Sequence, residues 1–139
     1  MKNIFIAILT LIVTLGVSYG QSYKVIVNKS NGITSISKSD LSDLFMKKDT
    51  KFSNGNRAVP VDQKGNSDVR NSFSTGVHDK SIAAIKSYWQ QSVFQGKATP
   101  PVEKSSDQEV IAYVASNPGA IGYVSSSTNT SSVKEVDVN

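Results

Sequence analysis

Residues 117–124 read Asn-Pro-Gly-Ala-Ile-Gly-Tyr-Val and join a helical pattern to an apolar strand through a sharp turn. Upstream of this stretch, Ser106 followed by Glu109 forms a capping box, which is typical of a helix start. Val110 and Val114 then fall on one helical face, and the Asn-Pro-Gly run ends the helix. The two glycines permit the turn and a close approach of the strand to its neighbours. We therefore expect a helix, a turn and a buried strand at residues 120–124.

The rest of the chain alternates short apolar β-runs with segments of helical periodicity. In the second β-run, Pro60 favours an edge strand or a strand end, because proline cannot donate to the ladder. This alternation predicts an α/β fold: a single layered domain with a mixed, largely parallel sheet flanked by helices. We expect strands over residues 23–27, 57–62, 120–124 and 133–138, and helices capped by Ser39, by Asn66 or Ser67 and by Ser106, with a longer helix over about residues 81–95.

Composition excludes several classes of protein. The chain has 139 residues, with 15 Lys and Arg against 11 Asp and Glu, and a formal net charge of +4. The charges are spread along the sequence, so we expect no nucleic-acid partner. Cysteine is absent and His78 is the sole histidine of the sequence. We therefore expect no metal, no cofactor, no thiol nucleophile and no lipid-bearing cysteine of a lipoprotein.

The N-terminal segment has the pattern of a secretory leader. Lys2 precedes an apolar stretch over residues 4–17, and Ser18 and Gly20 place small residues where a signal peptidase reads. The alternative is a membrane anchor, but 14 helical residues reach only about 21 Å, short of a hydrocarbon core of roughly 30 Å. We expect a signal peptide over residues 1–20, cleaved near Gly20, a single domain over residues 21–139, and a periplasmic or secreted protein.

Further short segments occur in a defined order along the chain. They are 41–45 (LSDLF), 54–55 (NG), 59–62 (VPVD), 67–73 (SDVRNSF), 88–89 (YW), 94–97 (FQGK), 100–101 (PP) and 117–124 (NPGAIGYV). In this order and spacing they resemble the phosphate-type substrate-binding proteins of ABC transporters, which have the type 2 periplasmic-binding-protein fold. The resemblance spans roughly residues 23–125. It implies one lobe of that fold, binding of phosphate or another small oxyanion at a helix N-terminus, and an ABC permease as partner.

The resemblance also points to a ligand site. In that family a turn of the form Arg-x-Asp-Gly-Ser-Gly-Thr holds phosphate with hydroxyl groups and backbone amides. The matching turn here is residues 63–69, Gln-Lys-Gly-Asn-Ser-Asp-Val, in which Ser67 keeps the family serine. Asp68 competes with an anion at the helix start, and Val69 lacks a hydroxyl donor. Lys64 and Arg70 supply positive charge near this turn, and an arginine can donate two parallel N–H groups to an oxyanion. The candidate ligand-binding residues are Ser67, Arg70, Lys64, Asn66, Asp68 and Val69.

The residues leave alternatives open at this site. Ser67 can serve as a helix cap alone while Arg70 pairs with Asp68 or with solvent. A chain of this length has room for one lobe, so an open half-site needs a second copy, as in a homodimer, or a partner protein as its other wall. The alternative function is a cell-envelope protein-interaction module with an eroded ligand site.

Other conspicuous side chains suit structural roles. We expect Tyr88 and Trp89 to lie on a core face of the helix over residues 81–95, with Phe94 widening its apolar stripe. We expect His78, next to Asp79, at the surface or in a cap. No Gly-x-Ser-x-Gly elbow is present in the sequence, and no nucleophile with its supporting motif can be assembled. We therefore expect a protein that is not an enzyme.

Overall fold

The structure, a computed structural model, describes residues 22–139. The predicted signal peptide and its cleavage near Gly20 lie outside the described residues. Within residues 22–139, no helix combines the length and apolar character that crossing a bilayer requires.

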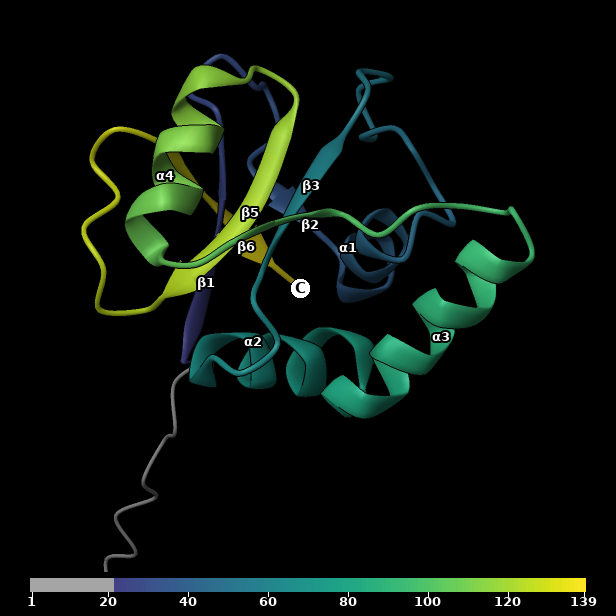
Figure 1. The fold of residues 1–139 in the computed structure, drawn as a ribbon. Helices are drawn as coiled ribbons and strands as arrows, with labels where there is room; N and C mark the ends of the chain where they lie inside the picture. Colours follow the sequence, from purple (N-terminus) through teal and green to yellow (C-terminus); the bar gives the residue numbers. More distant parts are fainter. Residues whose placement is uncertain (1–21) are drawn as a thin grey trace, which may run out of the picture.

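Residues 22–139 fold around a six-stranded sheet (Figure 1). The strand β1 (Tyr23–Val27) runs antiparallel to both of its neighbours, whereas the other three strand pairs of the described chain are parallel. The predicted mixed, largely parallel sheet is therefore confirmed. In spatial order the strands are β2 (Ser35–Ile36), β6 (Lys134–Val138), β1, β5 (Ala120–Ser125), β3 (Val59–Gln63) and β4 (Val102–Lys104).

A serine caps each of the four α-helices found in residues 22–139. The helices are α1 (Lys38–Phe45), α2 (Asp68–Phe73), α3 (Ile82–Phe94) and α4 (Asp107–Ser116), and α2 continues as a π-helical turn, η1 (Ser74–His78). The expected caps Ser67 and Ser106 are confirmed, and the helix expected from about residue 81 is capped by Ser81. The expected cap Ser39 is wrong: the Asp40 amide donates to the Ser37 hydroxyl at 3.1 Å, which starts α1 earlier.

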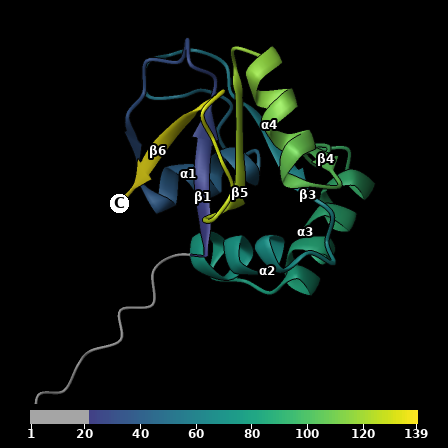
Figure 2. The same ribbon diagram turned by 90° about the vertical axis from the view of Figure 1, so that its left-hand side faces the viewer.

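Strand side chains alternate between two apolar layers. Val25 and Val27 pack in one cluster with residues of α1 and α2, while Ile26, between them, packs with Val110 and Val114 of α4. Figure 2 shows α4 beside β5 and α2 below the start of β1. The sheet is therefore covered on both faces, as expected of an α/β layered domain.

The helix α3 stands outside these two layers (Figure 1). Ile85 and Trp89 are buried against Met46 in a separate small cluster, which confirms the core role of Trp89. Tyr88 is half-buried and its hydroxyl donates to the Met46 carbonyl at 3.0 Å. Phe94 is 92% exposed, so its expected place on the buried stripe is wrong. The helix ends at Phe94, and Gly96, which follows the C-cap Gln95, has a φ of +67° that suits glycine.

The position of Pro60 shows how a proline enters the interior of a sheet. The Val59 amide donates to the Gly119 carbonyl at 2.8 Å, so the nitrogen of Pro60 points toward the opposite neighbour, β4. Pairing between β3 and β4 begins only at Val61 and Val102. The missing N–H is therefore not needed, and Pro60 lies near a strand end, as expected, but not on an edge strand. The short strands β2 and β4 were not expected.

The close packing expected at the two glycines of residues 117–124 is confirmed. A Cβ on Gly122 would lie 2.7 Å from Val110 Cγ1, and one on Gly119 would lie 2.7 Å from the Arg57 carbonyl oxygen. A methyl group at Gly122 would therefore push α4 off β5.

We predict that Gly122→Ala lowers the free energy of unfolding by about 1–3 kcal/mol, because it overpacks the contact between β5 and α4. The matched control is Gly32→Ala, since a Cβ there meets nothing within 4 Å. Chemical denaturation of both variants measures the difference. Equal stability of the two variants would contradict the close approach of α4 to β5.

Candidate functional site

The predicted site residues lie on the turn between β3 and α2 and on the first turn of α2. Lys64, Asn66 and Asp68 are exposed, and Ser67 is half-buried. The Ser67 hydroxyl accepts a hydrogen bond from the amide of Arg70 at 3.2 Å. That hydroxyl keeps its own hydrogen free to donate. Val69 instead packs into the apolar cluster beneath α2.

Arg70 is buried and held by groups of the protein. Its Nε lies 3.3 Å from Asp62 Oδ1, and its Nη1 lies 3.4 Å from Glu103 Oε1 and donates to the Gln63 carbonyl. The alternative pairing of Arg70 with Asp68 or with solvent is therefore not what the structure shows. Of the three guanidinium nitrogens, only Nη2 has no partner among residues 22–139. Arg70 also lines a groove beside α3.

A polar network extends from this arginine across the end of the sheet. Asp62 accepts hydrogen bonds from the Tyr123 hydroxyl and, at 3.0 Å, from the Gln63 amide. Burial raises the pKa of Asp62, against the opposing effects of Arg70 and the Tyr123 hydrogen bond. Burial likewise raises the pKa of Tyr123, so this phenol stays protonated. The network fixes Arg70 as a structural cation.

A second branch ties the turn to α4. The Gln63 side chain donates to Asp107 Oδ1 at 2.7 Å, and Asp107 Oδ2 accepts from the Ser125 amide at 3.1 Å and from Thr128 Oγ1 at 2.6 Å. Burial alone would raise the pKa of Asp107, but hydrogen bonds from Thr128, Gln63 and Ser125 lower it. Sequence patterns did not indicate Asp62, Glu103 or Asp107 as partners of the turn. For Asp62 a signal existed, namely an acid closing an apolar β-run.

The turn presents free donors and a cation from α3. In the part of the chain that the structure describes, the amides of Gly65, Asn66, Asp68 and Val69 have no protein acceptor. The Lys86 Nζ lies 3.3 Å from the point that a Cβ on Gly65 would occupy. Free amides at a helix start, together with an ammonium group, are the donors that hold a small anion.

His78 is buried rather than at the surface, so that prediction is wrong. Its Nδ1 lies 2.8 Å from the Ser42 hydroxyl, and its ring stands edge-on to Phe73. Burial, followed by the charges of Arg70, Lys80 and Lys48, lowers its pKa to about 4. The fold therefore holds this imidazole neutral.

The sequence matches no known protein-family profile and no curated protein. Solved structures do share its fold. An ABC-type phosphate transport receptor from Vibrio cholerae matches with a TM-score of 0.67 and 17% identity over 84% of this chain and 46% of that chain. A Clostridium perfringens protein assigned as a phosphate ABC transporter substrate-binding protein, with phosphate bound, matches with a TM-score of 0.67 and 21% identity over 84% of this chain and 44% of that chain.

A possible phosphate-binding protein from Planctomyces limnophilus also shares the fold. It matches with a TM-score of 0.63 and 17% identity over 85% of this chain and 41% of that chain. The present chain thus spans less than half the length of each of these three proteins. The fold implied by the resemblance is confirmed: the chain has the architecture of part of a phosphate-type substrate-binding protein, which fits a single lobe.

We predict that Arg70→Met lowers the free energy of unfolding by about 3–5 kcal/mol, because it leaves the buried Asp62 carboxylate without its cation. Lys64→Met is the matched control, since Lys64 is exposed, and it should change stability by less than about 0.5 kcal/mol. Adding Asp62→Asn to Arg70→Met should recover part of the loss. Urea denaturation checks all three, and a small effect of Arg70→Met alone would refute the structural role of the ion pair.

We predict that the protein loses stability as the pH falls below about 6.5, the ordinary value for histidine. The pKa of His78 is about 4 in the folded protein, so the unfolded chain binds the proton first. Between about pH 7 and pH 5.5 the loss should be roughly 1 kcal/mol. A His78→Gln variant should show a flatter profile over this range. Matching profiles for the two proteins would show that His78 is not the group responsible.

Proposed function

We propose that the protein is an extracytoplasmic solute-binding protein that holds phosphate or another small oxyanion at the turn over residues 63–69. The observation that carries this proposal is the placement of the Lys86 ammonium beside Gly65, in the turn whose amides have no protein acceptor in residues 22–139. The shared fold supports it, because one of the similar structures is described with bound phosphate. We assign a binding role without catalysis.

Each of the predicted residues receives a role in this proposal. Ser67 donates its hydroxyl hydrogen, and the backbone amides of Asn66, Asp68 and Val69 donate along the same side of the turn. The exposed Lys64 side chain adds positive charge on the solvent side of the site. The buried Arg70 is a positioning residue, because it donates to the Gln63 carbonyl and so holds the first residue of the turn in place.

Two features set the affinity of this site. The Asp68 carboxylate lies in the first turn of α2, where it competes with an anion for the helix dipole. Residues 22–139 provide one wall of the site, so an anion bound to them alone would face solvent and its charge interactions would be screened by salt. A second wall, supplied by another protein or a second copy, would therefore raise the affinity. An ABC permease is the transport partner that we propose.

The same proposal covers the location of the protein. We propose that residues 1–20 direct export and are removed near Gly20, which places residues 21–139 in the periplasm or outside the cell. Oxyanion capture for transport requires this location, because the solute is met outside the membrane.

We predict that phosphate raises the melting temperature of the protein at low ionic strength. At about 100 times the dissociation constant a ligand adds roughly 2.7 kcal/mol, which shifts the midpoint by on the order of 10 °C. Lys86→Met and Ser67→Ala should each reduce the shift, whereas chloride should not produce it. The measurement is a thermal melt with and without phosphate.

Lys97→Met is the matched control, because Lys97 is an exposed lysine beyond the end of α3. It should leave the phosphate-induced shift unchanged. No shift in the parent protein at millimolar phosphate, with a cooperative melt, would overturn phosphate capture by this chain. An equal loss in the Lys86 and Lys97 variants would show only a general effect of charge.

A further inference from the structure

The two edges of the sheet differ in how they are protected. At the β4 edge, the Lys64 amide donates to the Lys104 carbonyl at 3.1 Å. The backbone N–H and C=O groups of residues 102 and 104 therefore point toward β3, and those of Glu103 point outward. The residues immediately before β4 are Pro100 and Pro101, which have no N–H to offer. This edge is therefore closed to a further strand.

The β2 edge is open. Thr34 and Ile36 accept from the Asp137 and Asn139 amides of the β6 side at 3.0 Å each, and the Lys38 amide donates to the Asn139 carbonyl at 2.8 Å. Backbone groups alternate along a strand, so the N–H and C=O of Ser35 and the N–H of Ser37 point away from β6. These groups have no partner within residues 22–139.

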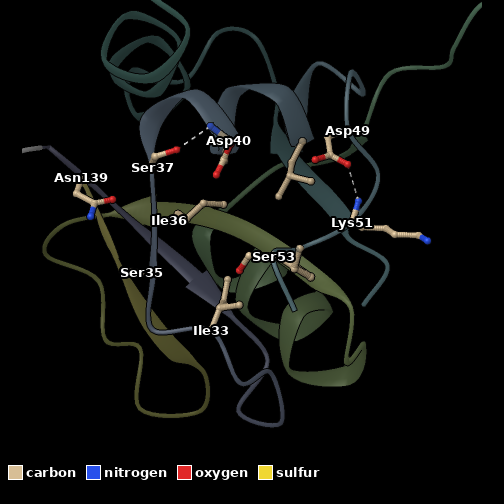
Figure 3. Close-up of a pocket in the computed structure, with 11 residues that line it drawn as sticks. Ile33, Ser35, Ile36, Ser37, Asp40, Asp49, Lys51, Ser53 and Asn139 are labelled. Carbon is tan, nitrogen blue, oxygen red and sulfur yellow. Dashed lines mark hydrogen bonds between the residues drawn. The ribbon is translucent and has the colours of Figure 1, made fainter. Parts of the chain in front are cut away.

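A hollow of about 350 Å³ lies along this open edge. Figure 3 shows the backbone of residues 33–37 on one side of the hollow and the segment that carries Lys51 and Ser53 on the other. Leu44 and Phe52 give the hollow an apolar lining. An unpaired strand edge beside an apolar hollow has the geometry by which a sheet accepts an extended peptide.

The charge of the hollow selects the kind of peptide. Asp40 and Asp49 line it, and neither has an ion pair in the described part of the chain. Asp49 Oδ1 accepts from the amides of Thr50 and Lys51 at 2.7 and 3.2 Å, which fixes its carboxylate in place. Lys51 also lines the hollow, but its ammonium group points away from it (Figure 3). The lining is therefore acidic and favours a basic side chain.

We propose that the β2 edge binds an extended segment of a partner protein that pairs with Ser35 and Ser37 and places a lysine or arginine between Asp40 and Asp49. This interaction surface is separate from the turn over residues 63–69 and does not depend on the oxyanion proposal. Main-chain hydrogen bonds supply the affinity, and the two carboxylates supply the preference for a basic residue.

The test uses the ¹⁵N-labelled protein and an acetylated, amidated pentapeptide of sequence Thr-Val-Lys-Val-Thr. Titration is followed by NMR, and the expected result is a saturable shift of the Ser35 and Ser37 amides, with slower hydrogen exchange at Ser35. A second peptide with glutamate in place of lysine should bind more weakly. A third, N-methylated on alternate backbone nitrogens, should not bind, because it lacks the donors that pair with the edge.

Variants separate the two parts of the proposal. Ser35→Pro removes the outward N–H while leaving the bonds of Thr34 and Ile36 to the β6 side, and it should weaken the lysine peptide by roughly tenfold. Asp40→Asn and Asp49→Asn should each weaken it by roughly two- to fivefold. The matched control is Asp137→Asn, an exposed acid on β6 that does not line the hollow, and it should leave the affinity unchanged.

The outcomes are decisive in both directions. Amide shifts confined to residues near β2, together with a preference for lysine over glutamate, support the proposal. No shift at millimolar peptide, or shifts centred on the groove beside α3, overturn it. Equal binding of the lysine and glutamate peptides rejects the basic partner. If the Ser35 amide is protected from hydrogen exchange without any peptide, and the protein sediments as a dimer, the proposal of a different partner is overturned. The occupant of the edge is then a second copy of this chain.

Discussion

The buried guanidinium of Arg70 is the group around which the end of the sheet is organised. It comes from α2 and meets Asp62 on β3 and Glu103 on β4, while Tyr123 on β5 donates to the same Asp62 carboxylate. Burying this charge costs free energy that only these partners offset, since removing one leaves an uncompensated charge. One side chain thus fixes α2 against three neighbouring strands and sets the base of the turn over residues 63–69.

This arrangement decides how the turn can act. Because Arg70 is neutralised by carboxylates, the positive charge for the proposed oxyanion would come from Lys86 on α3 and Lys64 in the turn, with the free amides at the start of α2. α3 stands apart from the sheet, and the small cluster around Trp89 packs it against Met46 at the end of α1. The proposed site therefore combines the turn over residues 63–69, which the Arg70 network holds in place, with the less extensively packed helix α3. Its affinity depends on both.

The two sheet edges show a second division of roles. Pro100 and Pro101 protect β4, next to the proposed anion site, from pairing with another chain. The opposite edge keeps unpaired backbone groups on β2 beside two carboxylates. The proposed solute site and the proposed partner surface thus lie toward opposite edges of one sheet. Binding at one would not compete with binding at the other.

The sequence alone determined the α/β class, the main strands, the cap at Ser106, a cap at Asn66 or Ser67 and a helix starting near Ser81, because periodicity and capping act within a few residues. It also identified residues 63–70 as the segment of interest. Tertiary structure decided that Arg70 pairs with Asp62 and Glu103, that His78 is buried and that Lys86 reaches the turn. These facts depend on strand order and helix docking, which bring together residues that are far apart in the chain. Local sequence patterns do not predict such contacts, because they act within a few residues.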